Sequence, residues 1–272
     1  MKEYKVFLTG CVRQAEASLE DQLQHLLKIR ELFSDDSVIC IIENDSTDNT
    51  AKILDNYQKT YKNFLSFSFT KLILRKPLRT DRLAFCRNFA ANLARTSFGH
   101  FDYYIVADLD NILSNETAAA IPKCFSLEED WDVLFANSLP KYYDVWALRS
   151  AQLGITYDCW DAITHDRKKG DAWQLVKQKH VKDFQKEIDP GRSLIPVESA
   201  FNGLGIYRMK CITESPPGAY KGIRGACEFQ HPLAACHLEC CEHVSFHKHL
   251  ITQNNKLFIA PFLLINAQME HL

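Results

Sequence analysis

Short apolar runs alternate with helix-like segments through the first half of the chain. Each run has the length and composition of a strand that is buried on both faces of a sheet. The runs are Tyr4–Leu8, Val38–Ile42, Phe67–Leu74 and Tyr103–Ala107. Strands that are separated by helices run parallel to one another, with right-handed crossovers. The alternation therefore predicts an α/β fold, with a mostly parallel central sheet flanked by helices in a single large domain.

Helices are expected between these runs, because the intervening segments have an amphipathic pattern or a candidate N-cap. They are Leu19–Phe33, a segment from Ser46 or Thr47 to Tyr61, and Asp81–Ser97 with Thr80 as its N-cap. Beyond Asn111 we expect a helix over Glu116–Phe125, a strand over Val133–Ala136 and a further strand over Tyr142–Ala147. The charged segment Trp160–Lys186 is either a surface helix or a mobile lid.

The overall composition excludes several classes of partner. The chain has 272 residues and a formal charge of −2, so it has no excess of basic residues for nucleic acid. Its most apolar segment, Leu257–Ile265, is broken by Pro261 and is too short to span a membrane. Half of the ten cysteines are scattered in apolar surroundings, as expected of buried thiols in a reducing compartment. We expect a cytoplasmic protein with no nucleic-acid partner and no transmembrane segment.

Two carboxylates directly follow the apolar run Tyr103–Ala107. They are Asp108 and Asp110, separated by a single leucine. Open α/β sheets bind their ligands at the carboxyl ends of the strands, where both side chains can turn toward one point. Carboxylate oxygens suit a hard divalent cation that keeps open positions for phosphate oxygens. The pattern predicts a metal and phosphate site, and its alternative is a solvated acidic turn.

A polar turn, Glu43–Thr50, stands where the second run ends and the next helix begins. A carboxylate at a strand end can accept from a base N–H or a ribose hydroxyl, while the helix N-terminus organises the turn. Four arginines surround the following loop and helix: Arg75, Arg79, Arg82 and Arg87. Cations near a helix N-terminus oppose the helix dipole, which anion binding would explain. The alternatives are a capping turn and salt-bridged surface arginines.

Five segments in this order resemble the nucleotide-sugar-dependent glycosyltransferases of the GT-A fold. They are Glu43–Thr50, Asp108–Asp110, Tyr142–Arg149, Phe201–Arg208 and Cys241–His247. The last three are similar to a subgroup that includes the fungal capsule-associated mannosyltransferases and some bacterial and large-virus sugar transferases. Those fungal enzymes carry an N-terminal membrane anchor that this sequence lacks, so we expect a cytosolic relative of bacterial or viral type. A second departure is Asp45, which falls where glycine is usual.

The resemblance implies transfer of a sugar from a nucleoside-diphosphate sugar, such as a UDP- or GDP-sugar, to an acceptor hydroxyl in surface glycan synthesis. The acceptor would be a glycan, a lipid-linked or a protein-linked molecule. Residues 1–111 would bind the nucleotide, and residues 112–272 would bind the acceptor and close the site. The implied nucleotide-sugar ligands are Glu43, Asp45, Arg79, Arg82, Asp108, Asn202 and Gly203.

The resemblance also implies a Mn²⁺ or Mg²⁺ ion held by Asp110 and Asp108, with His243 or His247 as a third ligand. The ion would stabilise the charge that grows on the leaving diphosphate. In an inverting enzyme a carboxylate removes the proton from the acceptor hydroxyl. Glu242 and Glu198 are the two candidates for this general base.

Two other functions compete with this interpretation. A sugar nucleotidyltransferase would share the sheet and the metal carboxylates, but it usually has a glycine-rich phosphate loop, which Thr9–Arg13 matches poorly. A non-catalytic binding module could be stabilised by zinc on the pairs Cys236/Cys240 and His243/His247. Only two residues separate these pairs, which is much shorter than the loop of a zinc finger. Buried thiols and surface histidines are the structural alternative.

Overall fold

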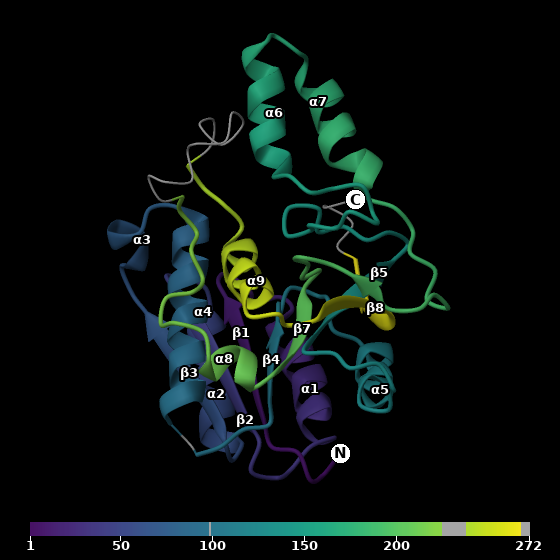
Figure 1. Cartoon of the computed structure of the whole chain (residues 1–272). Coiled ribbons are helices and arrows are strands. Elements are labelled where there is room, and N and C mark those ends of the chain that lie inside the picture. Colours follow the sequence, from purple (N-terminus) through teal and green to yellow (C-terminus); the bar gives the residue numbers. More distant parts are fainter. Residues whose placement is uncertain (98, 225–237, 268–272) are drawn as a thin grey trace.

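The computed structural model describes residues 1–97, 99–224 and 238–267 (Figure 1). These residues form an eight-stranded sheet in the order β3-β2-β1-β4-β7-β5-β8-β6. The strands are β1 Val6–Val12, β2 Val38–Asn44, β3 Phe64–Phe69, β4 Tyr103–Ala107, β5 Val133–Leu139, β6 Ile195–Pro196, β7 Leu204–Arg208 and β8 Leu257–Asn266. Only β7 and β6 run against their neighbours. The predicted α/β fold with a mostly parallel sheet is confirmed.

Helices cover both faces of this sheet (Figure 1). They are α1 Leu19–Arg30, α2 Thr50–Thr60, α3 Leu72–Arg75, α4 Arg79–Thr96, α5 Asn115–Cys124, α6 Cys159–Lys168, α7 Trp173–His180, α8 Lys210–Thr213 and α9 Glu242–Thr252, with a short 3-10 turn at Lys182–Phe184. Successive strand residues point to opposite faces, so Phe7 and Tyr104 pack with α4 and α9 while Leu8 and Ile105 pack with α1 and α5. The strand β4 is wholly buried between the two layers.

The predicted third strand, Phe67–Leu74, is wrong in its second half. The strand β3 ends at Phe69, and Leu72 begins the short helix α3. The Asp45 carboxylate causes this change, because it accepts the backbone N–H groups of Leu72 at 3.0 Å and Ile73 at 2.7 Å. An acceptor from a different loop thus turns an apolar run into a helical turn. Local sequence carries no sign of this contact.

Two helix starts also differ from prediction. Helix α2 begins at Thr50 with Asn49 as its N-cap residue, and not at Ser46 or Thr47. Helix α4 begins at Arg79, so Thr80 lies in its first turn. The Thr80 hydroxyl donates to the carbonyl oxygen of Gly222 at 2.7 Å. The Thr80 hydroxyl, which was predicted to cap the helix, therefore makes a tertiary contact instead.

The segment Trp160–Lys186 contains two antiparallel helices, α6 and α7, which stand above the sheet as a hairpin (Figure 1). Gly170, with φ of 98°, lies in the turn between them. Of the two alternatives, the surface-helix interpretation is confirmed, as two helices in place of one. Tyr142–Ala147 does not form a strand and is an irregular loop. None of the helices in the described ranges has the length and apolar character needed to cross a bilayer.

Asp166 joins the two helices of the hairpin. Its carboxylate contacts His180 Nε2 at 2.7 Å and Lys179 Nζ at 2.8 Å on α7. These contacts with His180 and Lys179 hold the pKa of Asp166 well below its usual range. A carboxyl group with a depressed pKa stabilises the fold above its unfolded-state pKa and loses this effect as the pH falls.

We expect Asp166→Asn to lower the free energy of unfolding by about 1.5–3 kcal/mol at pH 7, because a charged acceptor is lost. The difference from the wild type should shrink below about pH 4, where the unfolded chain takes up the proton. Urea unfolding of both proteins at pH 7 and pH 3.5 measures this difference in the free energy of unfolding. Equal stability at pH 7 would show that the contact does not hold the hairpin. Asp36→Asn, an exposed position far from the hairpin in sequence, is the matched control.

Candidate active site

Arg87 is a buried cation at the centre of the candidate site. It lies in the stripe of α4 that faces the sheet, together with Ala84 and Ala91, and it is 4% exposed. Its Nε donates to Glu242 Oε1 at 2.9 Å, and its Nη2 donates to Asp108 Oδ1 at 3.1 Å. Burial favours the neutral form, but the two carboxylates outweigh it and raise the pKa of Arg87 well above its usual value. Arg87 is therefore charged, and it links α4, β4 and α9.

Asp108 and Asp110 lie at the carboxyl end of β4. Asp108 is anchored by its backbone N–H, which donates to the Gly203 carbonyl oxygen at 2.8 Å. Burial raises the pKa of Asp108 to about 6; Arg87 opposes this shift and the nearby charge of Asp110 adds to it. Asp110 itself is exposed. The negative charge of Asp110 favours the protonated form of Asp108, and a divalent cation bound at the pair would stabilise both carboxylates as anions.

The donor chemistry at Asp108 and Asp110 fits a Mn²⁺ or Mg²⁺ ion, because both metals take oxygen ligands. Within the described ranges, no group of three or more His, Cys, Asp or Glu side chains is gathered as a metal site. An ion at these two carboxylates would therefore complete its coordination with ligand or water oxygens. The third protein ligand expected at His243 or His247 is not assembled beside them.

The two histidines occupy buried positions on α9. His247 is fully buried, and hydroxyl groups contact both of its ring nitrogens: Ser199 at Nδ1 and Tyr207 at Nε2, each at 2.9 Å. This arrangement leaves it no free position for a metal ion. His243 stacks on Phe201 with 3.8 Å between ring centroids. Burial lowers the pKa of His243 well below its usual value, so the ring is neutral. Both side chains belong to the packing beneath the site.

The turn Asn202–Gly203 holds the site's loops together. Both residues have positive φ, 52° and 84°. A Cβ atom on Gly203 would approach Ile112 Cδ1 to 2.6 Å, so only glycine fits here. The Asn202 side chain, fully buried, accepts from the backbone N–H groups of Tyr143 at 3.2 Å and Asp144 at 3.3 Å. Asn202 and Gly203 thus fix the 142–147 loop beside the end of β4.

Asp144 is the carboxylate of this loop. Its oxygens accept the backbone N–H groups of Ala147 and Asn202, each at 3.2 Å. Burial raises the pKa of Asp144 to about 6, and the charges of Asp108 and Glu242 add to the shift. The side chain is nevertheless partly exposed. A partly accessible carboxyl group with a raised pKa beside a ligand site is a candidate for proton transfer.

The two expected bases lie in different surroundings. Glu242 is 4% exposed, and its carboxylate pairs with Arg87. Glu198 is exposed, and no hydrogen bond or ion pair within the described part of the chain connects its side chain to Asp108 or Arg87. The structure brings Glu242 to the site as a buried partner and leaves Glu198 outside it.

The carboxylates of the Glu43–Thr50 turn shape the turn itself. Glu43 is 2% exposed; it accepts the backbone N–H of Ser46 at 2.7 Å and the hydroxyl of Ser68. Asp45 adopts the left-handed conformation, with φ of 53°. Aspartate tolerates this region better than most residues, which explains how it replaces the usual glycine. Burial alone would raise the pKa of Asp45, but the N–H of Ile73 and other donors lower it.

The two arginines expected to bind phosphate also differ. Arg82 is 6% exposed, and its Nη1 donates to the carbonyl oxygens of Lys76 at 2.9 Å and Pro77 at 2.6 Å. It therefore stabilises the loop before α4. Arg79, the first residue of α4, is exposed and accessible to a ligand.

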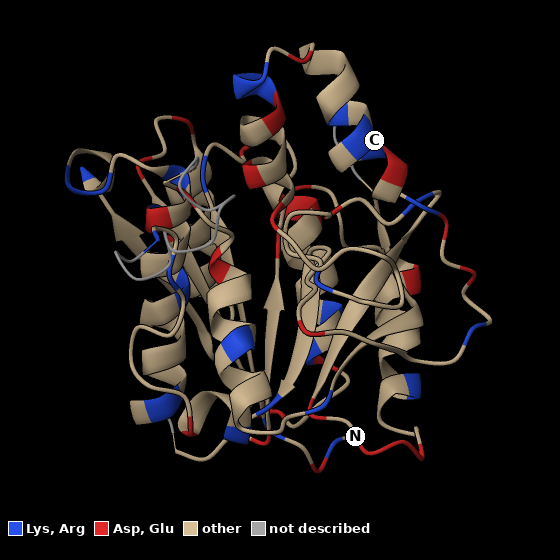
Figure 2. Cartoon of the chain, turned by 45° about the horizontal axis from the view of Figure 1, so that its top comes forward, with Lys and Arg blue, Asp and Glu red and all other residues tan. Residues whose placement is uncertain are grey.

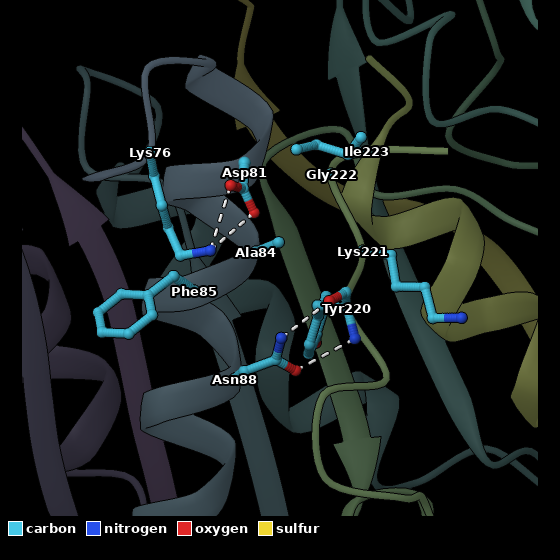
Figure 3. A pocket seen from close by; sticks show the side chains of 9 residues that line it. All are labelled: Lys76, Asp81, Ala84, Phe85, Asn88, Tyr220, Lys221, Gly222 and Ile223. Atoms are coloured by element: carbon cyan, nitrogen blue, oxygen red, sulfur yellow. Dashed lines mark hydrogen bonds and ion pairs between the residues drawn. The ribbon is translucent and has the colours of Figure 1, made fainter. Parts of the chain in front are cut away.

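A pocket of about 270 Å³ lies between α4 and residues 220–223 (Figure 3). Lys76 and Asp81 form an ion pair at one end, and Asn88 exchanges hydrogen bonds with the backbone of Tyr220 at the other. Neither Asp108 nor any other residue around the end of β4 lines this pocket. It is a groove beside α4 and is not the candidate active site.

The zinc interpretation cannot be followed at Cys236, which lies outside the described residues. Cys240 is described, and its Sγ donates to the Lys221 carbonyl oxygen at 3.2 Å. Among the described cysteines, Cys240 is partly buried and Cys241 is buried.

Comparison with known proteins gives a match only among solved structures. No protein-family model matches the chain, and no curated protein does. A mannosyltransferase from Pyrobaculum calidifontis, solved with GDP-Man and Mn²⁺, superposes with a TM-score of 0.51 at 10% identity, over 97% of this chain and 57% of that chain. The chain has the GT-A glycosyltransferase fold. S. aureus TarS and GalNAc-T7 also match over 97% of this chain, at 13% and 12% identity with TM-scores of 0.47 and 0.49.

The chain spans less than two thirds of each of these proteins, since it covers 60% of the TarS structure and 44% of GalNAc-T7. At these identities the likeness concerns the GT-A fold alone. Within this fold, Asp108 and Asp110 lie at the carboxyl end of β4, a central strand of the sheet.

Arg87 and Asp144 lie at the centre of the site in roles that the sequence did not predict. Arg87 was considered only as one of four arginines for anion binding, and Asp144 was given no role. A signal for Arg87 was present, because its spacing from Ala84 and Ala91 places it on the buried stripe of α4. A charged residue on such a stripe requires a buried partner. Asp144 had no comparable signal, because its contacts come from Asn202, far away in the sequence.

We expect Arg87→Met to lower the free energy of unfolding by about 3–5 kcal/mol, because Glu242 then lies buried without its counter-charge. The double variant Arg87→Met/Glu242→Gln should recover part of this loss. A double-mutant cycle from urea unfolding measures the coupling. Additive losses, or an unchanged Arg87→Met protein, would contradict a mutually dependent pair.

Proposed function

We propose that this protein is a metal-dependent glycosyltransferase that moves a sugar from a nucleoside-diphosphate sugar to an acceptor hydroxyl in surface glycan or polysaccharide synthesis. The observation that carries the proposal is the Asp108–Asp110 carboxylate pair at the carboxyl end of β4, in a sheet of GT-A fold, with the charged Arg87 behind it. We also propose that the protein is related to the capsule-associated mannosyltransferases. Three segments support this relationship: Tyr142–Arg149, Phe201–Arg208 and Cys241–His247.

The donor would bind to the half formed by residues 1–111, against the Glu43–Thr50 turn and the exposed Arg79. A Mn²⁺ or Mg²⁺ ion at Asp108 and Asp110 would supply positive charge to the leaving diphosphate. Arg87 supports this role because its hydrogen bond to Asp108 Oδ1 favours the ionised carboxylate and leaves Oδ2 available. Arg82, Glu43 and Asp45 would act by shaping the surrounding loops.

The acceptor would bind to the half formed by residues 112–272, with Asp144 as the general base. Asp144 is partly exposed and forms no ion pair within the described ranges, whereas Glu242 is buried against Arg87. Its pKa of about 6 leaves it ionised at neutral pH, so that it can accept the proton of the acceptor hydroxyl. The two backbone N–H groups that it accepts hold its orientation.

A sugar nucleotidyltransferase has less support. Such an enzyme would use a glycine-rich loop after β1 to cradle phosphates. Gly10 lies within β1, where a Cβ atom would approach the Ala107 carbonyl oxygen to 2.7 Å. Close packing of β1 against β4 therefore accounts for this glycine.

We expect Asp110→Asn to reduce turnover of the sugar donor by about 100-fold or more, because the ion loses a charged ligand. Release of nucleoside diphosphate in the presence of Mn²⁺ measures it. The melting temperature should stay within about 2 °C of the wild type, since Asp110 is exposed. Full activity of the variant would exclude the metal assignment, and Asp36→Asn is the control for a lost surface carboxylate.

We expect Asp144→Asn to lower kcat by about 100-fold while the KM for the donor changes little. A base must be ionised, so wild-type turnover should fall as the pH drops through about 6. Initial rates between pH 5 and 8 test this directly in the unaltered protein. A wild-type rate that is flat over this range would contradict the role of Asp144, whatever the stability of the variant.

A further inference from the structure

Large apolar side chains that remain exposed collect at one end of the described structure. They are Ile73, Leu74, Leu139, Trp173, Leu175 and Leu238. Helix α3, with Ile73 and Leu74, follows β3, and Leu139 is the last residue of β5. Figure 1 shows the α6–α7 hairpin standing above the same end of the sheet, opposite the N-terminus, with α3 to the left of the hairpin and lower. This is the end where β4 presents Asp108 and Asp110.

Two of the segments that carry these exposed side chains, α3 with its flanking residues and the tip of the α6–α7 hairpin, also carry positive charge (Figure 2). Residues 71–79 around α3 contain four cations and no carboxylate: Lys71, Arg75, Lys76 and Arg79. The hairpin tip, residues 167–175, contains three cations and one carboxylate: Arg167, Lys168, Lys169 and Asp171. The chain as a whole has a formal charge of −2, so both projections depart from its average. Exposed apolar and cationic side chains therefore coincide at two places beside the site.

Contacts with the rest of the hairpin position Trp173 at its tip. Trp173, 42% exposed, stacks on Trp160 with 6.1 Å between ring centroids and 22° between ring planes. At the base of the hairpin, Arg224 pairs with Asp161 at 2.7 Å. Trp173 and Leu175 are thus held in solvent by packing and ion pairs below them. Exposed apolar side chains gain little from folding in water, and a group of them marks an interaction surface.

We propose that α3 and the hairpin tip dock the protein on an anionic lipid bilayer and turn the candidate site toward an acceptor carried by a membrane lipid. The inference rests on the proposed function, because it selects the lipid-linked acceptor among the possible acceptors. Tryptophan and leucine side chains enter the interfacial region of a bilayer, while lysine and arginine pair with anionic headgroups.

A soluble anionic polymer would account for the cations but not for the apolar side chains. Leu74 in α3 is 77% exposed and Leu175 in α7 is 60% exposed. Neither gains burial from a hydrated polyanion, whereas both gain it from acyl chains. The combination therefore favours a membrane surface.

Co-sedimentation with vesicles tests this proposal. The wild type should bind vesicles of phosphatidylcholine containing phosphatidylglycerol, bind pure phosphatidylcholine vesicles weakly, and lose binding as salt rises. Leu74→Ser combined with Leu175→Ser should lower the bound fraction by more than about tenfold. Leu175→Ser alone, which leaves the Trp160–Trp173 stack in place, should give a smaller loss.

A charge-reversal pair gives the matched control. Reversal of the three cations at the tip, Arg167→Glu/Lys168→Glu/Lys169→Glu, should abolish binding to the anionic vesicles. Reversal of three exposed lysines outside both projections, Lys2→Glu/Lys59→Glu/Lys62→Glu, changes the net charge equally and should leave binding within about twofold. Equal loss in both triple variants would overturn a specific docking surface. Binding to soluble polyphosphate with none to vesicles would overturn the membrane assignment.

The failure of this proposal is distinguishable from that of the proposed function. Release of nucleoside diphosphate with a water-soluble acceptor should be unchanged in the tip variant, because the tip lies outside the candidate site. A protein that turns over the donor but never binds vesicles would retain the transferase assignment and lose the docking surface. A protein that binds vesicles but neither binds nor turns over a donor would lose the function on which the inference rests.

Discussion

The ion pairs of Arg87 are the interaction on which the candidate site depends. One buried guanidinium contacts Asp108 at the end of β4 and Glu242 at the start of α9, and it comes from the middle of α4. A buried charge of this kind is tolerated only when its partners are in place. The position of the Asp108 carboxylate therefore depends on the packing of α4 and α9, two helices that are far apart in the sequence.

Polar side chains also hold the loops around Arg87. Their oxygens accept hydrogen bonds from backbone N–H groups that have no partner in a helix or strand. Asp45 accepts from the start of α3, and Asp144 and Asn202 accept from each other's segments. Each of these contacts fixes a loop at the carboxyl end of the sheet. The same end carries the cationic and apolar projections of α3 and the hairpin, so donor, acceptor and membrane contacts would all lie on one side of the protein.

Local sequence was sufficient where local forces decide the structure. The run Tyr103–Ala107 matches β4 to the residue, and Asp108 and Asp110 directly follow its carboxyl end, as predicted. Local sequence was insufficient where a residue far away in the sequence determines the structure. The third strand is shorter than predicted because Asp45 holds the following residues in α3. The segment Tyr142–Ala147 is a loop where a strand was predicted, and Asn202 holds it through backbone hydrogen bonds. His247 was predicted as a metal ligand, but Ser199 and Tyr207 engage both of its nitrogens.

The central claim is that Asp108 and Asp110 bind a nucleoside diphosphate through a divalent cation. The most direct test is the melting temperature of the protein with UDP or GDP, each with and without Mn²⁺. A ligand that binds only the folded state raises the melting temperature by mass action. We predict a rise with one of the two diphosphates that requires Mn²⁺. No rise with either in folded protein, or a rise that is the same without metal, would contradict the claim.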